Sequence, residues 1–272
     1  MSELLQVNES TILIEEKFRG PPFSGNGGYV AGRVAALLNT RAPVEVTLRA
    51  PTPMDIPMDI EYRSKASVVV FQREGSKGET LIAEAAETSL ELSVPAPSSW
   101  QETLAASPSS YSFIDGVNPL ALNGQGVNPL ALNGQGVHPI CFCCGAAHTD
   151  GLEVFAAPVQ GGSQVAAIWK TKKDWAAGNG NLPEEYLWAA IDCPGQFAFM
   201  AGGIYTGMLG RLTAQIHQPA KAGDEYLVTG WRIGIEGKKH TAGTAIFTRG
   251  GDLVASAKAL WIGSREMPDA LK

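Results

Sequence analysis

The chain has 272 residues, enough for two domains with cores of their own, and its composition is that of an ordinary globular protein. A formal net charge of −6 at pH 7 argues against a dedicated nucleic-acid binder, which needs a basic face. No apolar run is long enough to cross a bilayer, and the N-terminus lacks the basic start and apolar stretch of a signal peptide. We therefore expect a cytoplasmic protein that binds neither nucleic acid nor membrane.

The first half of the chain predicts a short strand, one helix and then several strands. Residues 11–15 are β-branched and apolar, which indicates a strand. After a glycine-rich turn, residues 29–38 place apolar side chains on one face at helical spacing. Residues 44–48 alternate apolar and polar side chains, as a half-buried strand does. Three more strands are expected at residues 59–62, 66–72 and 80–94.

The composition changes in the middle of the chain, where Pro, Ser, Ala, Asn and Gly dominate. A ten-residue segment at 116–125 recurs without change at 126–135. A perfect short tandem repeat indicates a segment that tolerates insertion. We therefore divide the chain into an N-terminal unit, a linker and a C-terminal unit, at residues 1–95, 96–138 and 139–272.

The second half predicts a similar plan. Strands are expected at residues 152–155 and 164–169. A helix then starts at Asn181, which can cap it, and runs to about residue 191. Pro194 interrupts this helix, which predicts a kink just after Asp192. Four strands are expected to follow, at residues 212–218, 225–233, 241–248 and 253–262.

The two halves repeat one unit. Residues 44–51 align with 212–219, and residues 81–85 align with 253–257. Each copy follows a helix-like stretch rich in Gly and Ala. A duplicated unit predicts two similar half-molecules related by a pseudo-twofold axis. We expect the functional site at the interface between them.

The four cysteines are crowded. Cys141, Cys143 and Cys144 fall within four positions, and Cys193 stands apart, which is a poor disulfide framework. Cys141 and Cys144 have Cys-x-x-Cys spacing with His148 downstream, but a zinc site usually takes a second pair of ligands at similar spacing. We therefore expect a reduced structural cluster, with neither a metal nor a cofactor.

Three segments resemble known proteins. The Cys-Phe-Cys-Cys-Gly sequence at 141–145, with Gly151-Leu152 downstream, is similar to an opening found in many hotdog thioesterase-like proteins. Residues 189–192 resemble the helix segment that carries the catalytic Asp in that superfamily, and residues 247–256 resemble the closing hairpin of medium-chain type II thioesterases. The chain thus resembles the double-hotdog acyl-CoA thioesterases of the type II or TesB-like kind.

The resemblance implies an α+β fold with two tandem hotdog units, each an antiparallel sheet wrapped around a long helix, that form a pseudo-dimer. Asp192 is the strongest catalytic candidate, because an ionised carboxylate in its apolar run needs partners or a wet cavity. A structural hydrogen bond, or a position on the solvent side of the helix, is the alternative for this residue.

Asn26, Gly27 and Gly28 are the second catalytic candidates. Hotdog thioesterases often have His-Gly-Gly here, and a helix N-terminus can offer free N–H groups to an oxyanion. A tight loop that leads into the helix is the alternative. The first helix has Ala35 where the Asp would fall, and the second has Pro183 followed by two Glu residues where His-Gly-Gly would fall. We infer one composite site and one inactive mate.

Other polar residues are candidates for substrate binding. Medium-chain type II enzymes carry a Gln on the last strand and a Thr after the helix, and Gln196, Thr213, Gln215 and His217 are candidates for these roles. A polar strand face towards solvent is the alternative for the last three. Trp188 belongs to an aromatic group that either lines an acyl tunnel or forms ordinary core.

The resemblance implies hydrolysis of acyl-CoA or carrier-bound acyl thioesters, with Asp192 as base or nucleophile. A non-catalytic acyl-ligand-binding or scaffolding protein is the alternative, which the missing His favours. A hotdog hydratase would carry an Asp–His pair a few residues apart, and neither helix has one. We also expect a homodimer, because exposed sheet edges favour pairing.

Overall fold

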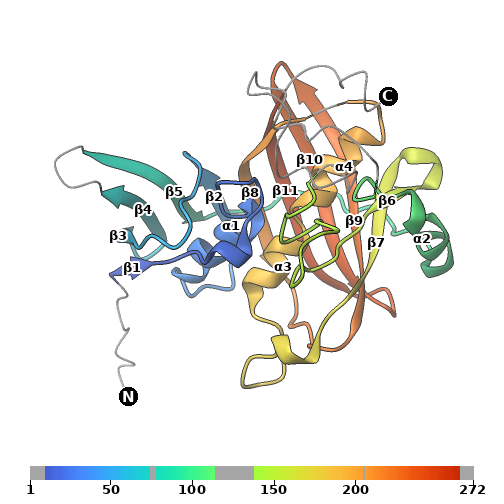
Figure 1. Cartoon of the computed structure of the whole chain (residues 1–272), viewed down its shortest axis with the longest axis horizontal. Coiled ribbons are helices and arrows are strands. Elements are labelled where there is room, and N and C mark those ends of the chain that lie inside the picture. The colour runs from blue at the N-terminus through green and yellow to red at the C-terminus, as the bar shows by residue number, and fades with distance from the viewer. Residues whose placement is uncertain (1–9, 74–77, 114–137, 205, 264–272) are drawn as a thin grey trace.

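The computed structural model describes residues 10–73, 78–113, 138–204 and 206–263 (Figure 1). Within these residues eleven strands form one sheet with neighbours paired antiparallel, in the order β1-β3-β4-β5-β2-β8-β11-β10-β9-β7-β6. The ten-residue repeat lies outside the described residues. None of the helices that these ranges contain is long and apolar enough to span a membrane.

The N-terminal half contains one long helix and five strands. The helix α1 covers Gly27–Ala36, two residues earlier at each end than predicted. The last strand ends at Glu87, well before residue 94, because both neighbouring strands begin opposite its end. There Ser67 pairs with Ala86, and Val44 pairs with Glu87. The strands are β1 (Thr11–Ile12), β2 (Val44–Leu48), β3 (Met58–Ser64), β4 (Ser67–Arg73) and β5 (Glu79–Glu87).

The C-terminal half contains two helices that follow directly on each other, and six strands. The helices are α3 (Glu184–Ala190) and α4 (Cys193–Met200). The strands are β6 (Ala157–Val159), β7 (Gln164–Lys170), β8 (Met208–Ile216), β9 (Glu225–Glu236), β10 (Lys239–Thr248) and β11 (Leu253–Ile262). Short 3-10 turns lie at Glu16–Phe18, Ser107–Ser109, Gln160–Gly162 and Lys173–Trp175.

The strand predicted at 152–155 does not form. The backbone N–H groups of Leu152 and Val154 donate to the carbonyls of Phe142 and Cys143, so they pair with the cysteine loop and not with a strand. Glu153 has a φ of 60°, which no strand residue adopts. Leu152 and Val154 are fully buried, so the apolar pattern came from burial of a loop.

The kink predicted after Asp192 is confirmed. Helix α3 ends at Ala190, helix α4 begins at Cys193, and Asp192 has φ −79° and ψ −80°, outside the helical region. Pro194 in the first turn of α4 needs no hydrogen-bond acceptor, so a new helix can start there. The break leaves the Asp192 side chain at a helix start.

The two halves join edge to edge at strands β2 and β8. Val44 pairs with Ala214, Glu45 with Thr213 and Val46 with Leu212. The sequence repeat makes residues 44–46 equivalent to 212–214, so Glu45 faces its own equivalent. A local twofold axis therefore passes between Glu45 and Thr213, and the strands follow outward as β5, β4, β3, β1 on one side and β11, β10, β9, β7 on the other. The predicted duplication and α+β double-hotdog fold are confirmed.

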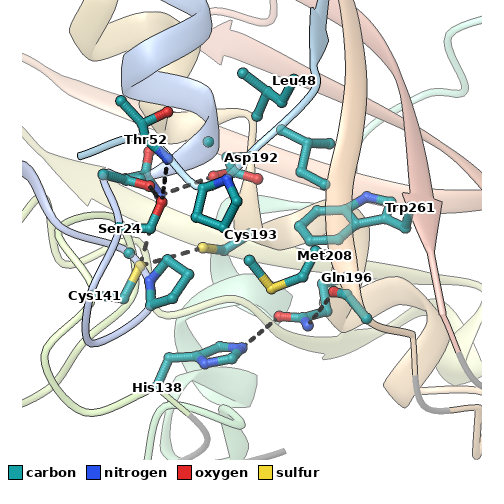
Figure 2. Close-up of a pocket in the computed structure, with 18 of the residues that line it drawn as sticks. Ser24, Leu48, Thr52, His138, Cys141, Asp192, Cys193, Gln196, Met208 and Trp261 are labelled. Atoms are coloured by element: carbon teal, nitrogen blue, oxygen red, sulfur yellow. Dashed lines mark hydrogen bonds between the residues drawn. The ribbon is translucent and has the colours of Figure 1, made fainter. Parts of the chain in front are cut away.

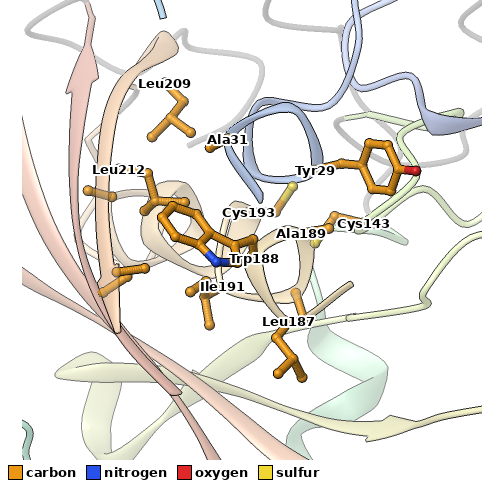
Figure 3. Packing of buried hydrophobic residues seen from close by; sticks show 14 of the residues in the cluster. Tyr29, Ala31, Cys143, Leu187, Trp188, Ala189, Ile191, Cys193, Leu209 and Leu212 are labelled. Atoms are coloured by element: carbon orange, nitrogen blue, oxygen red, sulfur yellow. The ribbon is translucent and has the colours of Figure 1, made fainter. Parts of the chain in front are cut away.

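Helices α1, α3 and α4 pack together on the concave side of the curved sheet (Figure 1). Helix α1 crosses α3 closely: a Cβ on Gly28 would lie 3.0 Å from the Cα of Ala189, and one on Gly32 would lie 2.7 Å from the Cα of Glu185. These glycines permit the crossing. Below it, Trp188 and Ile191 pack towards the sheet (Figure 3).

The segment expected to be a linker is partly folded. Helix α2 (Trp100–Ala106), capped by the Ser99 side chain, lies against β6 and β7 (Figure 1). Trp100 and Ala106 pack on the outer face of the C-terminal sheet, in the cluster that contains Trp231. Its apolar residues therefore cover a sheet face, a role that its loop-like composition hid.

Candidate active site

A cavity of about 230 Å³ lies where the two halves meet. Its walls come from the start of α1, the kink between α3 and α4, and the ends of β2, β8 and β11 (Figure 2). Both halves contribute: Asn26, Gly27 and Leu48 lie on one side, and Asp192 and Trp261 on the other. The structure thus brings together the Asp and the glycine turn that sequence reasoning assigned to one site.

Asp192 is buried, with 3% of its surface exposed, and its two oxygens differ. Oδ2 accepts hydrogen bonds from the backbone N–H of Gly28 at 2.9 Å and from Nδ2 of Asn26 at 2.8 Å. Oδ1 has no hydrogen-bond partner among the described residues. One oxygen is therefore held by the opposite half, while the other is a buried acceptor without a partner among the described residues.

Local sequence explains how this contact forms. Asn26 caps α1, since its Oδ1 accepts from the N–H of Tyr29 at 2.8 Å and its Nδ2 is then directed to Asp192. Gly28 has no side chain, and a Cβ there would lie 2.6 Å from the Cβ of Asp192. The helix cap, the glycine and the α3–α4 break together place the carboxylate at the start of α1.

Burial raises the pKa of Asp192 to about 7. The N–H of Gly28 and the amide of Asn26 oppose this rise, because they stabilise the charged form, whereas the nearby Cys141 thiol adds to it. A carboxyl group poised near neutrality can both accept and release a proton.

The geometry corrects the expected oxyanion donors. We expected the N–H groups of Gly27 and Gly28, with the Asn26 side chain, to face a substrate carbonyl. Gly28 and Asn26 instead donate to Asp192. The N–H of Gly27, the first of the helix, has no acceptor in the described part of the chain, and Gly27 lines the cavity. Gly27 is therefore the donor that remains for a ligand.

Gln196 also lies in the cavity wall, tied to its neighbours. Its Nε2 donates to the carbonyls of Thr206 and Gly207, each at 3.3 Å, and its Oε1 lies 2.8 Å from Nε2 of His138 (Figure 2). In this arrangement Oε1 accepts and His138 carries its proton on Nε2. Sequence reasoning missed His138, because it lies at the end of a segment interpreted as linker.

Three of the proposed binding residues lie away from this cavity. Leu212 and Ala214 of β8 point into the core, so Thr213 and Gln215 point to the opposite face. Thr213 donates to Oε2 of Glu45 at 3.3 Å, and His217, just past the strand, bonds to the hydroxyl of Ser256 at 2.9 Å. Thr213, Gln215 and His217 do share one face, as predicted, but this face does not line the Asp192 cavity.

Trp188 lies beside a second cavity of about 300 Å³. The local twofold axis relates this cavity to the first, and we call it the mate. There Glu185 takes the place of Gly28, and Ala35 takes the place of Asp192. Trp188 is buried in the core at this point (Figure 3), so it does not line the Asp192 cavity. Glu184, at the rim, forms an exposed ion pair of 3.1 Å with Arg41.

Searches with the sequence alone match no protein-family model and no curated protein. Solved structures do match across both halves. A proposed thioesterase from Novosphingobium aromaticivorans aligns over 93% of this chain and 94% of its own, with a TM-score of 0.59 and 13% identity. A proposed thioesterase II from Thermobifida fusca aligns over 95% and 94%, with a TM-score of 0.56 and 12% identity.

A third structure, the TesB protein of Mycobacterium avium subspecies paratuberculosis, aligns over 88% of this chain and 87% of its own, with a TM-score of 0.51 and 12% identity. At these identities the likeness establishes the fold. The two-unit architecture that the sequence resemblance implied is therefore confirmed as the architecture of thioesterase II and TesB-like structures.

Proposed function

We propose that this chain, whose fold is that of thioesterase II and TesB-like structures, hydrolyses acyl thioesters at the cavity that holds Asp192. One observation carries the proposal. A buried carboxylate has one oxygen fixed by Gly28 and Asn26 and the other without a partner, and Gly27, whose N–H is unpaired among the described residues, lines the same cavity. A fixed carboxylate and a free helix N–H are the groups that thioester hydrolysis needs.

The reaction would use the two free groups on one carbonyl. The N–H of Gly27 would donate to the thioester oxygen, which becomes negative as a nucleophile adds. Oδ1 of Asp192 would accept a proton from a water that attacks the carbonyl carbon. The carbon–sulfur bond would then break, and the proton would pass to the leaving thiolate. The products are a carboxylic acid and a free thiol.

Direct attack by Oδ1 would use the same geometry and form a mixed anhydride that water then opens. A single turnover in oxygen-18 water detects the second route when water opens the anhydride at the Asp192 carboxyl. With Asp192 as base, the first product acid carries the heavy oxygen. With Asp192 as nucleophile, and water opening the anhydride at the Asp192 carboxyl, the first product carries the light oxygen of the side chain.

A non-catalytic acyl-ligand-binding or scaffolding role is the second candidate. The observation that favours it is Asn26, since the resemblance implies His at this position and Asn cannot exchange a proton. Under this alternative the cavity would bind an acyl thioester and release it unchanged.

The substrate class that we propose is acyl-CoA or a carrier-bound acyl group. Four free, buried cysteines fit a reducing compartment, so we also propose a cytoplasmic location. We propose a homodimer and the unit boundaries at residues 95 and 138 as well. Light scattering on the purified chain would test the dimer.

The test is a hydrolysis screen over acyl-CoAs from acetyl to long chains, repeated with acyl carrier protein thioesters. We expect release of free thiol for at least one chain length, and a fall of about 100-fold or more in the Asp192→Ala variant. Binding of the thioester without thiol release from either carrier would support the non-catalytic role and contradict hydrolysis.

A further inference from the structure

Four cysteines gather beside the cavity, and two of them, Cys141 and Cys193, line it. Cys141, Cys143 and Cys144 come from the loop at 138–152, and Cys193 is the first residue of α4. All four are buried free thiols. The sulfurs of Cys141, Cys144 and Cys193 lie within 4.8 Å of one another, and those of Cys141 and Cys193 are 3.7 Å apart (Figure 2). Three thiols from two segments thus surround one point.

This spacing is that of a metal site. A tetrahedral zinc ion with Zn–S bonds of about 2.3 Å holds its sulfurs about 3.8 Å apart. The Cys141–Cys193 separation of 3.7 Å already matches, and a closure of at most about 1 Å would bring the other sulfurs to that spacing. The Cys-x-x-Cys sequence lacked a further ligand nearby, and the fold supplies Cys193 from a distant segment.

The loop holds two of the sulfurs in place by itself. The N–H of Gly145 donates to the carbonyl of Cys141 at 2.8 Å, and that of Ala147 donates to the carbonyl of Pro139 at 2.8 Å. A Cβ on Gly145 would lie 2.5 Å from the backbone nitrogen of Cys141, so only glycine permits this turn. The turn carries the sulfurs of Cys141 and Cys144 close to each other.

Other occupants fit these three sulfurs less well. A disulfide joins two sulfurs at about 2.05 Å and would leave the third without a role. Iron–sulfur clusters take four cysteine ligands, whereas zinc also accepts three protein ligands and a water, and hard ions such as magnesium prefer oxygen. Thiolates favour zinc.

We propose that Cys141, Cys144 and Cys193 bind one zinc ion. The ion would tie the loop at 138–152 to the start of α4. Because Cys141 and Cys193 both line the cavity, the tie would fix the wall beside Asp192. Binding would release the thiol protons to solvent. This proposal goes beyond thioester hydrolysis and stands or fails without it, because its test measures metal and not turnover.

The test measures zinc in the purified full-length chain, prepared without a metal-affinity tag. We expect about one zinc per chain in the wild type and less than about a tenth of that in Cys144→Ala. Cys143→Ala is the matched control, since Cys143 is equally buried but lies outside the three-sulfur group, and it should keep the zinc. Background zinc in the wild type, copper in its place, or equal loss in Cys143→Ala would overturn the assignment.

A second measurement uses the wild type alone, so it tests the proposal even if the Cys144→Ala variant fails to fold. Metal-free wild type is titrated with cobalt(II), which reports thiolate ligands through charge-transfer absorption. We expect saturation at about one cobalt per chain, reversed by excess zinc, and a lower unfolding temperature after chelation. Absence of the thiolate band in a folded wild type would contradict the proposal.

Discussion

The two cavities occupy equivalent places on either side of the β2–β8 seam, yet they contain different chemistry. One joins Asp192 to the start of α1 through Gly28 and Asn26. In the other, Ala35 replaces the carboxylate and Glu185 replaces the glycine. The second cavity is the larger, at about 300 Å³ against about 230 Å³, so volume does not distinguish them. The difference lies in the donors at the helix start.

The comparison shows what a buried carboxylate needs in this fold. Asp192 is held by two donors that an opposite helix start provides. At the mate, Pro183 stands at the cap position without a side-chain hydrogen bond and without an N–H. A carboxylate at position 35 would lack the side-chain amide donor that Asn26 gives to Asp192, so Ala35 suits this buried environment better.

The largest expected effect is on turnover, from a matched pair of substitutions. Asp192→Asn keeps the size of the side chain but removes the proton acceptor, so kcat/KM should fall about 100- to 10,000-fold. Glu185→Gln also converts a carboxylate to an amide, but in the mate cavity, so kcat/KM should stay within about twofold of the wild-type value. Steady-state thiol release measures both. Equal losses in the two variants would show that the cavities act alike.

A second prediction places a carboxylate in the mate. Ala35 is buried, so Ala35→Asp should lower the free energy of unfolding by about 2–3 kcal/mol, since the mate has no side-chain amide like that of Asn26 to hold the new carboxylate. It should also add no hydrolysis to an Asp192→Ala background. Urea unfolding and thiol release measure the two effects. A stable variant with restored turnover would mean that the mate still has working donors.

Gly28→Ala and Gly32→Ala test the helix crossing from both sides. A Cβ at either position meets the opposite helix backbone within 3.0 Å, so each variant should lose about 1–3 kcal/mol of unfolding free energy. Only the Gly28 variant should also lose activity, because its new Cβ would lie 2.6 Å from the Cβ of Asp192 and displace the carboxylate that the Gly28 N–H holds. Loss of activity in Gly32→Ala at equal stability would argue that the crossing angle, and not the Gly28 contact, supports the reaction.

The smallest effect is expected at Asn26. Asn26→Ala removes the cap of α1 and should cost about 1 kcal/mol of stability. It also removes one of two donors to Oδ2 of Asp192, so activity should fall by about tenfold. Thermal unfolding and kcat/KM are measured together. Asn26→Ser, which restores the cap alone, should recover stability without activity; recovery of both would reduce Asn26 to a cap.

The fold was predictable because local patterns determine most of it. Alternation located β2, and the repeat predicted the twofold axis now seen between Glu45 and Thr213. The strand predicted at 152–155 was wrong because the buried side chains of a loop give the same apolar pattern as a strand. The N–H groups of Leu152 and Val154 donate to the cysteine loop. Spacing alone does not tell where a backbone donor finds its acceptor.

The site was predictable only in part. Asp192 and the glycine turn came from the resemblance, and their pairing came from the complementary losses in the two halves. Their hydrogen bonds did not follow, because the donation from Gly28 to Asp192 depends on the helix crossing and on the break before α4. The sequence also separated Cys193 from the other cysteines, because only the folded chain brings it close to Cys141 and Cys144.

The central claim is that a single cavity in each chain binds the acyl thioester. The most direct test is calorimetric titration with a non-hydrolysable acyl-CoA thioether, using a chain length selected by the hydrolysis screen. We predict one ligand per chain, with binding lost when Gly27→Val fills the Asp192 cavity and kept when Ala35→Val fills its mate. Two ligands per chain, or binding that survives Gly27→Val and disappears in Ala35→Val, would contradict this account.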